Sequence, residues 1–183
     1  MNSYLDSIKK QMAYYRSLGD KTFDQLDDPQ LFWQTDDANN SIAMMVKHMH
    51  GNMMSRWTDF LDSDGEKEWR QRDAEFDNDI PDRATLLAKW NAGWDCLFSA
   101  LDALTDTDLE REIYIRNMGH TVTEAINRQL AHYAYHVGQI VFLGKMIKKD
   151  SWQSLSIAKG QSKAYNQEKF SKPKRKEHFT DDL

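Results

Sequence analysis

Four long amphipathic patterns dominate this chain, and each repeats its apolar side chains at the three- and four-residue steps of an α-helix. They cover about residues 3–26, 41–61, 82–104 and 121–148. The chain has only eight glycines and three prolines in 183 residues, which is low for a sheet protein that needs many turns. Helices of this length bury their apolar faces against one another, so we expect an all-α four-helix bundle.

Local signals mark where these helices begin. Ser41, Asp82 and Thr121 stand where a side-chain oxygen would cap a helix N-terminus. Thr121 and Glu124 also have the spacing of a capping box. Between the third and fourth helices, residues 113–116 predict a briefly extended segment.

The length fits one domain, which we place at residues 1–170. Residues 152–170 should hold a short helix or an ordered strap. The charged tail at residues 171–183 predicts a flexible segment. A polar, charged loop covers residues 63–80.

Composition narrows the range of partners. The chain carries 24 Lys and Arg against 29 Asp and Glu, for a net charge of −5, which argues against nucleic-acid binding. It has no apolar run of the roughly 20 residues that span a membrane, and its first residues lack the pattern of a signal peptide. The single cysteine, Cys96, excludes an internal disulfide and fits a reducing compartment. We therefore expect a cytoplasmic protein with no nucleic-acid or membrane partner.

Three histidines are the strongest chemical signal. His132 and His136 leave the fourth predicted helix on one face, because four residues turn a helix by about 40°. His48 flanks the apolar stripe of the second helix, and metal sites in bundles take their ligands from facing helices. His48, His132 and His136 are therefore the best candidate ligands for a divalent metal. Their spacing alone leaves open that they are hydrogen-bonded structural residues.

A site with three protein ligands would resemble catalytic zinc, because structural zinc is usually closed by four. Asn52, one turn after His48, would orient a ligand or bind substrate; its alternative role is a polar helix contact. Tyr133 projects toward the core and Tyr135 away from it.

The remaining histidines fit the site less well. His50 projects about 160° away from His48, so the two cannot face one metal together. His120 lies in a loop and is a weak fourth candidate, and His178 belongs to the tail and should be solvated.

Other reactive groups favour structural interpretations. Cys96 has no neighbour in sequence that would lower its pKa, which predicts a packed, inert thiol. Glu66, Glu68 and Glu75 form no paired motif and predict a solvated loop. The methionines of the second helix favour core packing over copper binding.

Two helical segments resemble the DinB-like superfamily. Residues 41–57 resemble its second helix, and residues 119–140 resemble its metal-bearing fourth helix. The segment at residues 154–162 is similar to one found in a small, uncharacterised bacterial branch of that superfamily. The resemblance covers about residues 1–170.

This resemblance implies a four-helix bundle of up-down-down-up type with a short C-terminal extension. It also implies a divalent metal, zinc or nickel, held by three histidines, which match His48, His132 and His136. Related proteins include bacillithiol and mycothiol S-transferases and a mycothiol-dependent maleylpyruvate isomerase, and many members are homodimers.

Three functions follow as hypotheses. The first is a metal-dependent transferase that joins a low-molecular-weight thiol to a small electrophile, with the metal lowering the pKa of the thiol. The alternative is a non-catalytic metal-binding or stress-response protein, in which the metal is structural and the surface forms a homodimer. The third is a metal-free helical adaptor. The sequence names neither the thiol nor the electrophile, and His50 and residues 63–80 match no known thiol-binding feature.

Overall fold

The computed structural model describes residues 4–182 and is mostly helical. Its α-helices are α1 (Tyr4–Phe23), α2 (Asp28–Leu31), α3 (Ile42–Trp57), α4 (Arg83–Ala103), α5 (Val122–Lys148) and α6 (Ser162–Ser171). Short 3-10 turns are η1 (Asp73–Phe76), η2 (Asp106–Asp108), η3 (Lys149–Ser151) and η4 (Phe179–Asp182). The predicted all-α class is confirmed, with one small hairpin added. Ser3, where the first predicted helix begins, lies outside the described residues.

The predicted helix caps are confirmed. The side chains of Ser41, Asp82 and Thr121 each accept a hydrogen bond from the amide three residues further on, at 3.1, 2.7 and 3.1 Å. These bonds satisfy amides that a helix N-terminus leaves without a partner. Helix α3 ends at Trp57, short of its predicted end, because the backbone turns extended at Thr58, with ψ of 127°, and Asp59 then takes a positive φ of 47°.

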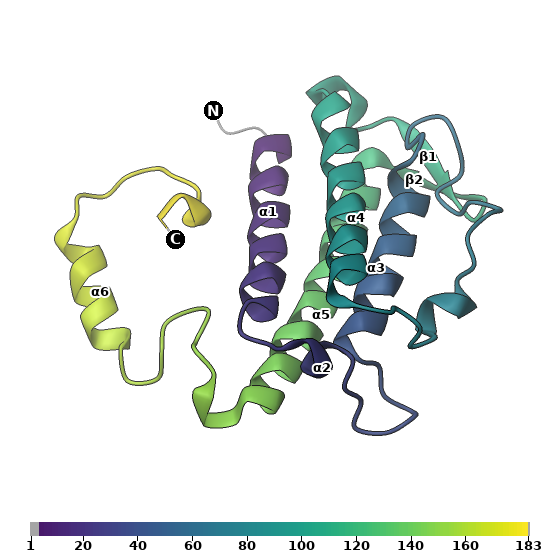
Figure 1. The fold of residues 1–183 in the computed structure, drawn as a ribbon. Coiled ribbons are helices and arrows are strands. Elements are labelled where there is room, and N and C mark those ends of the chain that lie inside the picture. Colours follow the sequence, from purple (N-terminus) through teal and green to yellow (C-terminus); the bar gives the residue numbers. More distant parts are fainter. Residues whose placement is uncertain (1–3, 183) are drawn as a thin grey trace.

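The four long helices lie side by side around one core (Figure 1). Helix α3 packs on α4 and on α5, and α1 packs on α5 and on α4. The chain runs one way along α1 and α5 and the opposite way along α3 and α4 (Figure 1). Trp90, Trp94 and Tyr133 are among the largest fully buried side chains. Tyr135 is 62% exposed, so the predicted orientations of the two tyrosines are confirmed.

The extended segment predicted before the fourth helix is one strand of a hairpin. Strand β1 (Glu112–Ile115) pairs antiparallel with β2 (Met118–Thr121). The turn residues Arg116 and Asn117 have φ of 56° and 58°, as a tight two-residue turn requires. Both of their amides donate to the carboxylate of Asp64 at 2.8 Å, which ties the hairpin to the segment that follows α3.

The C-terminal segment leaves the helical body and returns to it. Helix α6 stands apart from the four long helices (Figure 1). Lys10 on α1 lies 2.6 Å from Asp181, and the ring of Phe179 meets that of Tyr14 edge-on at 5.5 Å.

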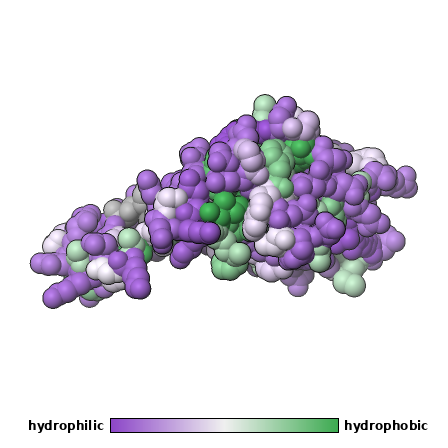
Figure 2. Space-filling model, turned by 60° about the horizontal axis from the view of Figure 1, so that its bottom comes forward, coloured by the Kyte–Doolittle hydropathy of each residue, from purple (hydrophilic) through white to green (hydrophobic). Residues whose placement is uncertain are grey.

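The face in Figure 2 is mostly hydrophilic, with small separate hydrophobic patches. Between residues 4 and 182, no helix is both long enough and apolar enough to cross a bilayer.

Candidate metal centre

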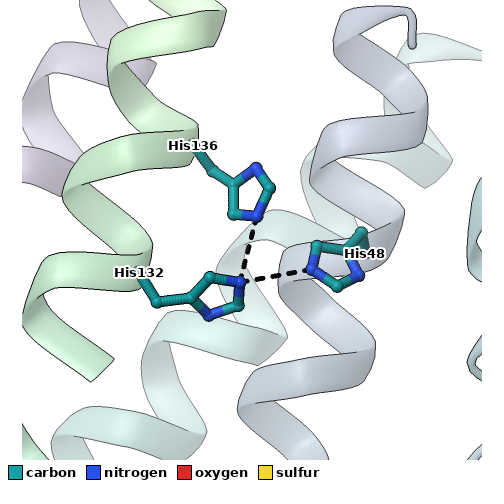
Figure 3. Close-up of side chains that lie close together, drawn as sticks. All are labelled: His48, His132 and His136. Atoms are coloured by element: carbon teal, nitrogen blue, oxygen red, sulfur yellow. Dashed lines mark hydrogen bonds between the residues drawn. The ribbon is translucent and has the colours of Figure 1, made fainter. Parts of the chain in front are cut away.

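Helices α3 and α5 bring the three predicted histidines together. In Figure 3 the rings of His132 and His136 leave α5 toward that of His48 on α3. The Nε2 atom of His132 lies 3.3 Å from Nε2 of His48 and 3.0 Å from Nε2 of His136. All three side chains offer a ligand atom within 4.8 Å of the others. The three histidines that were predicted to lie on facing helices therefore do lie close together in the structure.

The spacing of these nitrogen atoms fits a metal ion. Tetrahedral zinc with Zn–N bonds of 2.0–2.1 Å holds its ligand atoms about 3.3 Å apart. The separations of 3.0 and 3.3 Å around His132 match that spacing with little adjustment. Imidazole is also a good ligand for nickel and related divalent metals, so the donor set fits several of them.

The outer ring nitrogens have partners that turn the inner ones toward the centre. His48 Nδ1 lies 2.9 Å from Oε2 of Glu75, and His136 Nδ1 lies 2.9 Å from Oε1 of Gln139. Both oxygens accept, so each Nδ1 carries the proton. In the neutral ring each Nε2 then keeps a free lone pair, which is the tautomer that a metal needs.

Burial keeps two of these rings neutral. Desolvation, and then the neighbouring His136 and His48, lowers the pKa of His132 to about 3. Desolvation, followed by His48, lowers the pKa of His136 to about 4. Both imidazoles are therefore uncharged at neutral pH and do not need to lose a proton before they bind a metal.

Glu75 belongs to this centre, and the prediction that it lies in a solvated loop was wrong. Its side chain is 7% exposed and accepts hydrogen bonds from Arg70 at 2.8 Å (Nε) and 2.9 Å (Nη2). Burial alone would raise the pKa of Glu75, but the bonds from His48 and Arg70 outweigh it and lower the pKa. The result is a buried carboxylate–histidine pair of the kind that orients metal ligands. No local pattern marks Glu75, because its partners come from α3 and from the loop itself.

The segment around η1 also covers the outer face of His48. The ring of Phe76 stacks on that of His48 with centroids 4.9 Å apart, and the guanidinium of Arg72 lies over Phe76 at 5.4 Å. The charged loop predicted at residues 63–80 therefore forms one wall of the histidine cluster.

Gly51 permits the close approach of Glu75 to α3. A Cβ at Gly51 would lie 2.1 Å from Oε1 of Glu75, well inside contact distance. Because Arg70 and His48 both hold this carboxylate, it cannot move without losing a hydrogen bond. We expect Gly51→Ala to lower metal affinity by about 10- to 100-fold, the usual effect of losing a group that orients a ligand. Competition with a chromophoric chelator measures this.

Gly138→Ala is the matched control, since nothing lies within 4 Å of the added Cβ on α5. We expect it to leave metal affinity unchanged and to stabilise the fold by about 0.5–1 kcal/mol. Equal metal affinity in the two variants would show that Glu75 does not orient His48.

Asn52 is buried beside the cluster. Its Oδ1 accepts a hydrogen bond from the Tyr133 hydroxyl at 3.0 Å, and that hydroxyl accepts one from Trp57 Nε1 at 2.9 Å. This network fixes the amide of Asn52. The residue also lines a cavity of about 290 Å³ that reaches His48 and His132.

The other candidates lie apart from the cluster. His50 is half-buried on α3, and desolvation lowers its pKa. His120 accepts a hydrogen bond from Arg128 at 2.8 Å instead of reaching the three histidines. Desolvation raises the pKa of Cys96, whose sulfur lies 3.7 Å from the Thr58 hydroxyl, in agreement with a packed thiol.

Comparison with known proteins gives a family and no activity. Residues 1–161 match a family described as "Protein of unknown function (DUF1572)". The chain belongs to this family. No curated protein and no solved structure matched. The description assigns no chemistry, so the histidine cluster is the best guide to the function of this protein.

Proposed function

We propose that this protein binds a divalent metal ion through His48, His132 and His136 and acts with it on a small molecule. The observation that carries the proposal is the convergence of three imidazole nitrogens next to a polar cavity. Three protein ligands leave a coordination position for a small molecule. We propose zinc or nickel as the metal, because both accept imidazole ligands.

The more specific proposal is a transferase that joins a low-molecular-weight thiol to a small electrophile. A bound divalent cation would lower the pKa of a coordinated thiol and so supply thiolate at neutral pH. The resemblance of residues 41–57 and 119–140 to the DinB-like superfamily supports this chemistry. We also propose that the fold is a DinB-like four-helix bundle, because of the same resemblance and because α3 and α4 run opposite to α1 and α5.

The protein's own residues would hold and orient the reactants. Glu75 and Gln139 fix the rings of His48 and His136, while Tyr133 fixes Asn52 at the cavity wall. We assign Asn52 to substrate positioning because its side chain is buried and lines the cavity.

A structural metal is the second candidate. His48 lies on α3 and the other two histidines on α5, so a metal would join two of the long helices. The cavity beside the cluster favours the catalytic proposal, because a purely structural site has no need of one.

The test begins with tag-free protein, in which elemental analysis should find about one divalent metal per chain. Conjugation of cysteine, glutathione or bacillithiol to 1-chloro-2,4-dinitrobenzene is then measured with and without chelator. Turnover that depends on metal supports the transferase. The structural role is supported instead if the protein holds a stoichiometric metal, turns over none of the thiols, and melts at a lower temperature after chelation. Absence of metal would contradict both.

We also propose a homodimer. Tyr135, Phe142 and Met146 are exposed at helical spacing along α5 and offer an apolar stripe. Light scattering decides this, since a monomer mass of 21.5 kDa at micromolar concentration would contradict it.

A further inference from the structure

The cavity beside the histidines is lined by an unusual number of guanidinium groups. Five of its lining residues are arginines: Arg56, Arg70, Arg72, Arg116 and Arg128. They share the cavity with His48 and His132. Arginine is suited to such a place because its planar fork pairs with carboxylate and phosphate oxygens.

These arginines come from four separate parts of the chain. Arg56 lies on α3 and Arg128 on α5. Arg70 and Arg72 lie in the segment just before η1, and Arg116 is at the hairpin tip. The hairpin tip is held in place by the two amide bonds to Asp64. A row of solvated arginines would lie on the exposed face of a single helix. Here the arginines are close together only because the chain folds four separate segments around one cavity.

The nearby carboxylates neutralise only part of this charge. Glu75 pairs with Arg70, while Glu66 is shared by Arg56, Arg70 and Arg116 at 2.9, 3.2 and 3.2 Å. Asp73, 3.9 Å from Arg72, is fully exposed and screens that guanidinium little. Arg128 contacts His120 and no carboxylate in the described residues. The cavity therefore keeps an excess of positive charge.

Two residues that line the cavity each hold a buried polar atom with no hydrogen-bond partner within residues 4–182. These atoms are Nε of Arg56 and Oε1 of Gln129, and the two residues are only 5% and 4% exposed. Buried donors and acceptors nearly always have a partner, so these two side chains keep hydrogen-bonding capacity that a polar ligand in the cavity would use after a small side-chain movement. The volume of about 290 Å³ restricts that ligand to a small molecule.

We propose that this cavity binds a small molecule that carries about two negative charges, on carboxylate or phosphate groups, beside the three histidines. The role of that anion as substrate rests on the proposed function, but its binding does not require a metal. Arg116 and Arg128 contact the ligand directly, because both reach the cavity from exposed positions. Arg56 and Arg70 form the inner wall of the cavity.

Calorimetric titration of chelator-treated, dialysed protein with three probes at constant ionic strength tests this. Succinate represents a dicarboxylate, inorganic phosphate a phosphorylated ligand, and succinamide is the neutral counterpart of succinate. We expect succinate or phosphate to bind at least 10-fold more tightly than succinamide, and the stronger of the two identifies the anionic group.

Arg116→Gln should weaken binding of the more tightly bound anion by about 10-fold or more, since it removes one charged partner of the ligand. Arg111→Gln is the matched control, because Arg111 is also exposed and also pairs with one carboxylate, Asp62 at 2.7 Å, but does not line the cavity. Circular dichroism and metal content should be unchanged in both variants.

Two results would overturn the proposal. One is that neither anion binds more tightly than succinamide; the other is that Arg111→Gln weakens binding as much as Arg116→Gln. Neither result would contradict the proposed metal site if the protein contains a metal as purified. Conversely, tight anion binding by a protein that contains no metal as purified, before any chelator is added, would support the cavity and contradict the proposed metal function.

Discussion

The His132→Ala variant should lose stoichiometric metal. His132 is central to the cluster, with its Nε2 at hydrogen-bond distance from Nε2 of both His48 and His136. Its removal leaves two ligands on different helices. Loss of groups that only orient a ligand already costs 10- to 100-fold in metal affinity, so loss of a ligand should cost more than about 100-fold. Elemental analysis and chelator competition measure this.

His50→Ala is the control for this variant, because His50 lies two residues from His48 on α3 and outside the cluster. We expect it to keep its metal. The melting temperature of His132→Ala should also stop responding to added metal, since only the native state of the wild type gains stability from the ion. Full metal content in His132→Ala would contradict the assignment of all three ligands.

Glu75→Ala should be the most destabilising single change at this site. Arg70 has a side chain only 2% exposed, and Glu75 accepts two of its hydrogen bonds. Without Glu75, the buried Arg70 guanidinium keeps one carboxylate partner among residues 4–182, Glu66, which lies 3.2 Å from its Nη1. Removing one partner of a buried ion pair costs about 3–5 kcal/mol, so we expect the free energy of unfolding to fall by about that amount. Urea denaturation of the metal-free protein measures it.

The same variant should bind metal about 10- to 100-fold more weakly, because His48 loses the carboxylate that orients it. Glu68→Ala is the matched control, since Glu68 is an exposed carboxylate in the same loop. We expect its stability to change by less than about 0.5 kcal/mol. A similarly small change in Glu75→Ala would show that the Arg70 pair contributes nothing to the fold.

Much of the helical structure was predictable because its signals are local. Ser41, Asp82 and Thr121 cap helices in the structure as their positions predict. A cap requires only a side-chain oxygen and an amide three residues away, so sequence alone contains both partners. The end of α3 was placed too late, because no glycine or proline marks the extended backbone at Thr58 where the helix ends.

The three histidines were predictable for a related reason. A helix fixes the direction of each side chain, so the spacing of His132 and His136 placed both on one face. The facing-helix rule for bundles then added His48. Their meeting at 3.0 and 3.3 Å required no information beyond helix geometry and the packing of α3 on α5.

The surroundings of those histidines were not predictable. Glu75 and Arg116 lie in irregular segments, where no periodicity fixes the direction of a side chain. Glu75 was expected in solvent because nothing near it in sequence indicates that Arg70 folds back to pair with it. Arg116 reaches the cavity because Asp64, far away in the sequence, holds the hairpin tip.

The sequence by itself thus determined the helices, their caps and the shared face of His132 and His136, because each depends on regular spacing within a helix. Only the tertiary structure decided that His48 meets the other two histidines and what surrounds the three: the carboxylate of Glu75 on His48 and the arginine-lined cavity beside it. Those contacts join residues from α3, α5, the hairpin and the loop at residues 63–80. Electrostatic pairing between distant segments depends on how the whole chain packs, and no local pattern specifies it.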